Sequence, residues 1–183
     1  MFKIVAVCTG NVCRSPMIER LMRRRWAGHA AEFDISSVGT RALVGEPMDP
    51  MAAEELRRLG GDPEDFVARQ LQETHVAPAD LVLTATLGHR STVLNLAPQL
   101  LHRTFTLAEL ASLVPVAQGE SLQSLVQDSA RRRGASALET VEDLSITDPY
   151  GRSEALHARV ADEISIAVDR ILDVFVPVID ARR

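Results

Sequence analysis

The sequence is poor in cysteine, in long apolar runs and in net positive charge, and each shortage excludes a class of protein. Two cysteines do not make a disulfide framework, so a reducing cytosol is the expected compartment. The longest apolar runs fall far short of the ~18 residues that a membrane-spanning helix needs, and residues 1–7 are too short an apolar stretch for a signal peptide. A net charge of −5 argues against broad nucleic-acid binding. We therefore expect a cytoplasmic protein with no membrane span and no nucleic-acid partner.

The sequence also has no pattern typical of a metal site. Its two cysteines lack zinc-type spacing and partner ligands. Its five histidines show no ligand spacing, so scattered surface or core positions are the better interpretation. These histidines are His29, His75, His89, His102 and His157. The sequence thus predicts no metal ligands and no cofactor.

Strand and helix signals alternate along the 183 residues, which is typical of a parallel sheet with helices on both faces. The expected strands cover about residues 2–8, 35–38, 80–85 and 102–106, and the expected helices cover about residues 16–27, 50–59, 89–96, 121–133 and 154–177. No repeat, low-complexity tract or linker interrupts this order. We predict an α/β fold of the flavodoxin or Rossmann type, formed by residues 1–183 as a single domain around a central parallel sheet of about four strands.

Some residues predict where particular helices begin and end. Ser15 is suited to cap a helix that Pro16 opens, because a proline in the first turn loses no hydrogen bond. Ser121 is expected to open the helix at residues 121–133, and Gly134 to close it. Pro177 is expected to end the last helix.

The most informative stretch is residues 7–16, which read Val-Cys-Thr-Gly-Asn-Val-Cys-Arg-Ser-Pro and follow the apolar run at residues 4–7. The N–H groups of such a loop and the start of the next helix converge on one small volume, as they do at anion sites generally. This field favours the thiolate form of Cys8. Arg14 adds a planar set of donors that can grip two oxygens of a phosphate. The stretch therefore predicts an oxyanion-binding loop that carries its own nucleophile.

The same stretch resembles the active-site loop of the low-molecular-weight protein tyrosine phosphatases, Cys-x-Gly-Asn-x-Cys-Arg-Ser-Pro. Further segments that resemble the family are residues 37–40, 44–50, 68–71, 79–83, 103–107 and 148–151. The resemblance covers nearly the whole chain except about 30 residues before Asp148, and residues 114–140 are interpreted as a variable segment.

The resemblance implies a metal-independent phosphatase that acts through a cysteinyl-phosphate intermediate. Its nucleophile would be Cys8, its phosphate clamp Arg14 and its general acid and base Asp148. The substrate would be a phosphorylated protein, most favourably at tyrosine, and inorganic phosphate or other oxyanions would bind as product or inhibitor. The residues expected to bind the phosphate or substrate are Thr9, Gly10, Asn11, Val12, Cys13, Ser15 and Tyr150. Ser37 is the expected supporting partner of Asn11 in holding the loop.

Several positions keep a second interpretation. Cys13 is either inert packing or a resolving thiol that forms a reversible disulfide with Cys8 under oxidation. Tyr150 either walls the pocket beside an aromatic substrate ring or packs on the surface. Asp148 by itself could be a turn residue before a proline. Arg69 is expected to be structural and not catalytic.

The chain departs from the family pattern at a few positions. The loop around Leu43 lacks the aromatic residue that many members place beside the phenol ring. Phe66 stands where several members have a histidine behind the phosphate loop, and Thr86 stands where an aspartate is frequent. Val12 is aliphatic as in the tyrosine phosphatases of this fold, whereas related protein arginine phosphatases have threonine.

Three alternative functions follow from the same residues. A protein arginine phosphatase would use identical loop chemistry. An arsenate reductase would need an external thiol, because no cysteine follows Cys13. A non-catalytic phosphate-binding module would be expected to lack the nucleophile or the acid, and both are present.

Overall fold

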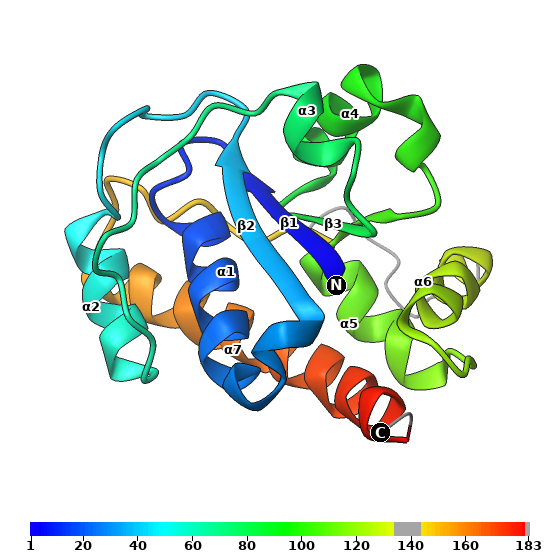
Figure 1. Ribbon diagram of the computed structural model, residues 1–183. Helices are drawn as coiled ribbons and strands as arrows, with labels where there is room; N and C mark the ends of the chain where they lie inside the picture. The colour runs from blue at the N-terminus through cyan, green and yellow to red at the C-terminus, as the bar shows by residue number, and fades with distance from the viewer. Residues whose placement is uncertain (134–143, 182–183) are drawn as a thin grey trace.

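The computed structural model describes residues 1–133 and 144–181 (Figure 1). Within these residues the sheet contains the strands β1 (Phe2–Cys8), β2 (Phe33–Gly39), β3 (Leu81–Thr84) and β4 (Thr104–Thr106). All pairings are parallel, and the order is β2-β1-β3-β4. The prediction of a parallel sheet of about four strands is therefore confirmed.

Seven α-helices surround the sheet within the described residues. They are α1 (Arg14–Arg25), α2 (Pro50–Arg58), α3 (Glu73–Val76), α4 (Leu87–Leu96), α5 (Leu107–Leu113), α6 (Leu122–Arg131) and α7 (Glu154–Asp180). Short 3-10 turns at Ala27–Glu32, Pro98–Leu100 and Val114–Val116 connect some of these elements. No described helix is both long enough and apolar enough to cross a membrane.

Alternating residues of the strands bury two separate apolar layers, because successive side chains of a strand point to opposite faces. In β1, Ile4 and Ala6 join the larger core, which α1, α2, α5, α6 and α7 cover. Val5 and Val7 join the smaller core, which α3 and α4 cover on the other face. The expected helices on both faces are thus present (Figure 1).

Register brings the carboxyl ends of the central strands together. Cys8, the last residue of β1, pairs with Gly39 at the end of β2. The preceding Val7 pairs with Thr84 at the end of β3. Ligands of open parallel sheets bind beyond this edge, next to a helix start. The loop between β1 and α1 lies there.

Two predicted helix ends are wrong. The first helix begins at Arg14 and not at Pro16, and the residue before it, Cys13, makes no side-chain cap. Ser15 therefore lies inside the helix, and its hydroxyl bonds other residues of the loop. The last helix continues through Pro177 to Asp180. Proline costs this helix one hydrogen bond near its end, and the turn that follows still buries Ile179 against the core.

The helix predicted at residues 121–133 is present as α6, and the Ser121 side chain accepts a hydrogen bond from the backbone N–H of Ser124. Its predicted closing residue, Gly134, lies outside the described residues. Asp49 caps α2 in the same way, because its carboxylate accepts from the N–H groups of Met51 and Ala52 (both 3.1 Å).

Candidate active site

The loop between β1 and α1 has an unusual backbone shape that buried side chains hold in place. Asn11 has a φ of 56°, in the left-handed region, and is completely buried. Its amide nitrogen donates to the hydroxyls of Ser15 and Ser37 (both 2.9 Å), and its amide oxygen accepts from the N–H of Arg69 (2.8 Å). The expected contact between Asn11 and Ser37 is therefore present, and Arg69 contributes backbone support.

The network continues to a buried carboxylate that sequence reasoning missed. The Ser37 hydroxyl donates to Glu19 Oε2 at 2.7 Å. Glu19 lies one turn beyond Ser15 in α1 and is buried, and Arg23 pairs with its other oxygen at 3.2 Å. A carboxylate that accepts in this way fixes the direction of the Ser37 proton. Ser37 is then left to accept from Asn11, which sets the orientation of the loop amide.

The nucleophile candidate lies next to a hydroxyl. Cys8 Sγ and Ser15 Oγ are 3.0 Å apart, in hydrogen-bond contact, and both residues are buried. The hydroxyl also accepts from Asn11, and Val38 O lies 3.4 Å away as a second possible acceptor for its proton. When the sulfur is ionised it can only accept, so Ser15 is placed to donate to the thiolate.

The guanidinium of Arg14 reaches across the same volume. Only 3% of Arg14 is exposed. Its Nη2 pairs with Asp148 Oδ2 at 2.7 Å, and its Nη1 donates to Ile146 O at 3.0 Å. Its Nε has no hydrogen-bond partner among the described residues, although it is buried. Arg14 thus keeps a buried donor that is suited to an oxyanion.

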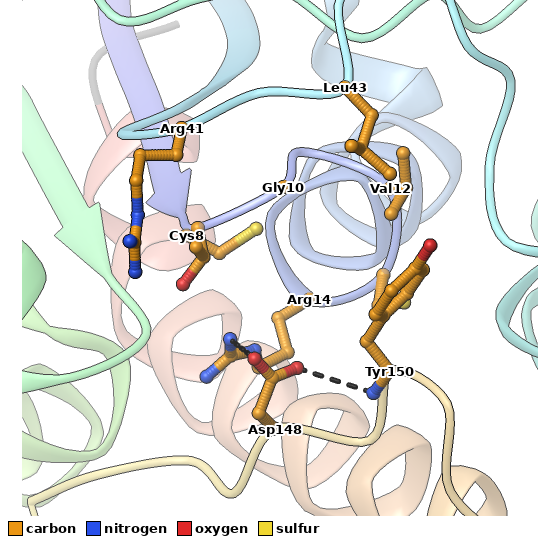
Figure 2. Close-up of a pocket in the computed structure, with 10 residues that line it drawn as sticks. Cys8, Gly10, Val12, Arg14, Arg41, Leu43, Asp148 and Tyr150 are labelled. Atoms are coloured by element: carbon orange, nitrogen blue, oxygen red, sulfur yellow. Dashed lines mark hydrogen bonds and ion pairs between the residues drawn. The ribbon is translucent and has the colours of Figure 1, made fainter.

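The segment before α7 brings the acid candidate over the loop. Ile146 is buried, and its N–H donates to Ala85 O at 2.8 Å, which anchors the segment to the end of β3. The Asp148 side chain is 51% exposed, and its Oδ1 accepts from the N–H of Tyr150 at 3.3 Å. Figure 2 shows Asp148 facing Arg14, with Tyr150 beside them. Arg14 and Asp148, 134 positions apart in the chain, therefore share one site.

These groups surround one pocket of about 150 Å³. Its lining residues are Cys8, Thr9, Gly10, Val12, Cys13, Arg14, Arg41, Leu43, Asp148 and Tyr150. The predicted residues Asn11, Ser15 and Ser37 lie behind the loop and hold it, so they do not line the pocket. Two lining residues, Arg41 and Leu43, were not predicted as site residues.

The two cysteines differ in their surroundings. Both are free thiols, and both are buried. Burial, followed by the negative charge of Asp49, raises the pKa of Cys13 far above its usual range. The raised pKa keeps Cys13 a neutral thiol, which is what the interpretation of Cys13 as a packing residue expects.

No group of three or more histidine, cysteine, aspartate or glutamate side chains could hold a metal ion within residues 1–133 and 144–181. Phe66, which stands where several relatives have a histidine, is buried instead beneath the guanidinium of Arg20, 5.6 Å from its ring centre.

His89 is the main site residue that the sequence did not reveal. Its Nε2 shares a hydrogen bond with Thr9 Oγ1, and its Nδ1 shares one with Thr86 Oγ1 (both 2.9 Å). Burial, and then the positive charge of Arg14, lowers the pKa of His89 to about 4. The neutral ring thus joins the start of α4 to the residue that follows the nucleophile.

This shift predicts a specific dependence of stability on pH. The ordinary pKa of histidine is 6.5, so between pH 6.5 and 4 the unfolded chain binds a proton at His89 that the folded protein does not. The contribution of His89 to the free energy of unfolding is fully present above pH 6.5 and is lost as pH falls toward 4. Urea unfolding across this range should show a shallower pH slope for His89→Gln than for the wild type. Equal slopes would contradict the assignment.

Gly39 lies against the loop so closely that no side chain fits. A Cβ at this position would lie 2.5 Å from Thr9 O and 2.9 Å from Asn11 N. The strand cannot move away, because Gly39 also exchanges backbone hydrogen bonds with Arg69 (2.9 Å) and Leu71 (2.7 Å).

We therefore expect Gly39→Ala to destabilise the fold by about 1–3 kcal/mol and to lower kcat/KM by displacing the loop. Gly28→Ala is the matched control, since a Cβ there would meet nothing within 4 Å. Urea midpoints would measure the loss of stability, and steady-state kinetics would measure the change in kcat/KM. Equal behaviour of the two variants would show that the close approach does not matter.

Comparison with known proteins gives a consistent result. The sequence profile of a family described as low molecular weight phosphotyrosine protein phosphatase matches residues 3–123. The low molecular weight protein-tyrosine-phosphatase Wzb of Salmonella typhi is 37% identical to the chain over 98 residues. This alignment covers 54% of the chain and 63% of that relative.

Solved structures match over more of the chain. A low molecular weight protein tyrosine phosphatase from T. tengcongensis has a TM-score of 0.73 at 26% identity, and the match covers 94% of this chain and 99% of that one. The YwlE arginine phosphatase from Geobacillus stearothermophilus has a TM-score of 0.70 at 25% identity, with coverage of 94% and 92%. Both structures share the fold, and they are named for different phosphatase activities.

Proposed function

The chain belongs to the low molecular weight phosphotyrosine protein phosphatase family, and on this premise we propose that it hydrolyses phosphotyrosine in proteins through a cysteinyl-phosphate intermediate. The observation that carries the proposal is the convergence of Cys8, Arg14 and Asp148 on one pocket. The family match ends at residue 123, so the role of Asp148 rests on this geometry and on the motif at residues 148–151.

In the first step, the Cys8 thiolate attacks phosphorus in line with the departing oxygen. An S–P bond forms while the P–O bond to the tyrosine breaks. Arg14 and the loop N–H groups of residues 9–15 hold the three equatorial oxygens, whose charge must be stabilised in the transition state. Ser15 donates to the sulfur, and this contact also makes Cys8 a better leaving group in the second step.

Asp148 supplies the proton that the departing tyrosine oxygen needs. Its carboxylate pairs with Arg14. A phosphoryl group that binds Arg14 competes for that guanidinium and releases the carboxylate. Asp148 then takes up a proton from solvent and, as the neutral acid, delivers it to the leaving oxygen. In the second step, water attacks phosphorus, its proton passes to Asp148, and the S–P bond breaks to give inorganic phosphate and the thiolate.

The walls of the pocket support an aromatic substrate. Figure 2 shows Leu43, Val12 and Tyr150 on one side of the mouth, beyond Cys8. Leu43 is 40% exposed and Tyr150 is 55% exposed, so both present apolar surface that a phenol ring could cover. Leu43 thereby replaces the aromatic residue that many members have in this loop.

A second candidate is a protein arginine phosphatase, because one structural neighbour carries that name. The aliphatic Val12 in the pocket wall favours tyrosine. Peptides that carry phosphotyrosine or phosphoarginine, assayed for kcat/KM in parallel, test the choice. Higher kcat/KM for phosphotyrosine supports the proposal, and the reverse order contradicts it.

We propose further that residues 1–183 form one catalytic domain and that it acts in the cytoplasm. Within the site, we assign phosphate binding to the backbone around Thr9, Gly10, Val12 and Cys13. We assign support of the loop to Asn11, Ser15 and Ser37.

A further inference from the structure

Arg41 is an exposed cation at the edge of the pocket that the mechanism does not use. Arg41 lines the pocket together with Cys8. Figure 2 shows Arg41 on the side of Cys8 opposite to Leu43 and Tyr150. Among the ion pairs of residues 1–133 and 144–181, none involves Arg41. Arg14, by contrast, is already paired with Asp148. Arg41 therefore has a charge available to a ligand.

The backbone that carries Arg41 is fixed to the phosphate loop. The N–H groups of Thr40, Arg41 and Leu43 donate to the carbonyls of Cys8, Thr9 and Gly10, respectively, each at 2.9 Å. The Gln70 side chain bonds the same segment from outside, accepting from Ala42 N at 3.0 Å and donating to Thr40 O at 3.1 Å. The starting point of the Arg41 side chain is thus set relative to the nucleophile.

A second hollow begins where the catalytic pocket ends. This groove has a volume of about 430 Å³, and Arg41 and Thr9 line both hollows. The groove is also lined by Thr40, Thr86, Gly88, His89 and Thr92. A chain whose phosphate reaches Cys8 could therefore continue past Arg41 into the groove.

The groove has the composition of an anion subsite and not of an apolar one. Arg41 supplies positive charge, and the Thr40 hydroxyl can donate a hydrogen bond. The other hydroxyls of the groove have partners within it: those of Thr9 and Thr86 share hydrogen bonds with His89, and that of Thr92 donates to Gly88 O. None of the described residues that line it is acidic, although the chain as a whole has a net charge of −5. His89, whose pKa is lowered, adds no competing charge near pH 7.

We propose that Arg41 and this groove bind a second anionic group of the substrate chain, close in sequence to the phosphorylated side chain. The anion is a carboxylate or another phosphoryl group. The inference rests on the proposed function and narrows its substrates to acidic or multiply phosphorylated segments.

The test compares three phosphotyrosine peptides of equal length. One has neutral flanking residues, one has glutamates and one has a second phosphotyrosine. The wild type should prefer the anionic peptides in kcat/KM by about 2- to 5-fold, the size expected for an exposed ion pair. The preference should shrink when the ionic strength rises from about 0.02 M to about 0.5 M. A preference for only one of the two anionic peptides would show whether the groove binds a carboxylate or a second phosphoryl group.

Variants assign the effect to Arg41. Arg41→Ala should bring the ratio of anionic to neutral peptide close to one, and Arg41→Glu should make a lysine-flanked peptide the better substrate. Arg170→Ala is the matched control, because Arg170 is also an exposed arginine but lies away from the pocket. Its neighbour in the sequence, Asp169, pairs with Arg25 at the end of α1 opposite to Arg14. This control should keep the wild-type ratio.

A wild type without preference, or an Arg41→Ala variant that retains it, would overturn the inference. Peptide dissociation constants in a Cys8→Ser background measure the same ratio without turnover. If the wild type hydrolyses no phosphotyrosine peptide, the proposed function fails. In that case the ratio of the affinities for anionic and neutral peptides still tests the subsite. A ratio that falls in the Arg41→Ala variant supports the subsite, and a ratio that does not change overturns it.

Discussion

Replacing Cys8 by serine is expected to lower phosphatase turnover by at least about 10³-fold, which corresponds to a barrier about 4 kcal/mol higher. A serine hydroxyl keeps its proton at neutral pH, and among the described residues the side chain that hydrogen-bonds residue 8 is not a strong base. The neighbouring side chain is the Ser15 hydroxyl at 3.0 Å, which is itself a weak base. Steady-state hydrolysis of a phosphotyrosine peptide measures the loss.

The fold and the anion site should survive this substitution. Serine is close in size to cysteine, and Arg14 and the loop N–H groups remain. The variant should therefore unfold at a similar urea concentration and should still be stabilised by added phosphate. Substantial turnover by the purified variant would exclude Cys8 as the nucleophile. Loss of phosphate stabilisation would show that the substitution damages the loop and not only the chemistry.

Replacing Asp148 by asparagine is expected to lower kcat by about 10²- to 10⁴-fold for substrates with poor leaving groups. The amide can keep a hydrogen bond to Arg14, but it cannot deliver a proton. The loss should be much smaller for p-nitrophenyl phosphate, whose leaving group departs without protonation. A plot of log kcat against leaving-group pKa should therefore be steeper for the variant than for the wild type.

The chain offers a closely matched control for Asp148→Asn. Asp169 pairs with Arg25 at 2.6 Å at one end of α1, as Asp148 pairs with Arg14 at 2.7 Å at the other end. Their side chains are 52% and 51% exposed. Asp169→Asn should leave the leaving-group slope unchanged. An Asp148→Asn variant with the wild-type slope would show that another group donates the proton.

The sequence placed Cys8 and Arg14 in one loop because their spacing is local, and the structure has both residues lining one pocket. Cys8 and Arg14 lie on a single turn between a strand and a helix, and their spacing is enough to define an anion site. Asp148 came from a family motif and not from local physics, since the fold alone brings it to Arg14 across 134 positions. The strand at residues 80–85 was predicted because an almost continuous apolar run is typical of a strand covered on both faces, and β3 (Leu81–Thr84) is present there.

Contacts between distant segments explain most of what the sequence did not reveal. Thr9 and His89, which share a hydrogen bond, are 80 positions apart. Gly39 must lack a side chain because the Thr9 carbonyl of the loop packs against it. The predicted cap by Ser15 is absent because α1 begins one residue before Ser15, at Arg14, and the Ser15 hydroxyl contacts Cys8 and Asn11.

Helix α5 is different, because a signal for it was present and was overlooked. Thr106 and Glu109 form a capping box at its start, a Thr-x-x-Glu pattern that can be found in the sequence.

The most direct test of the central claim is a search for phosphate on the Cys8 sulfur during turnover. The wild type, mixed with excess phosphotyrosine peptide and quenched within one turnover, should carry one phosphoryl group, which peptide mapping should locate on residue 8. The same experiment should give a burst of tyrosine product if breakdown of the intermediate is slow. Product formation without any phosphoryl group on Cys8, at quench times shorter than one turnover, would contradict the account.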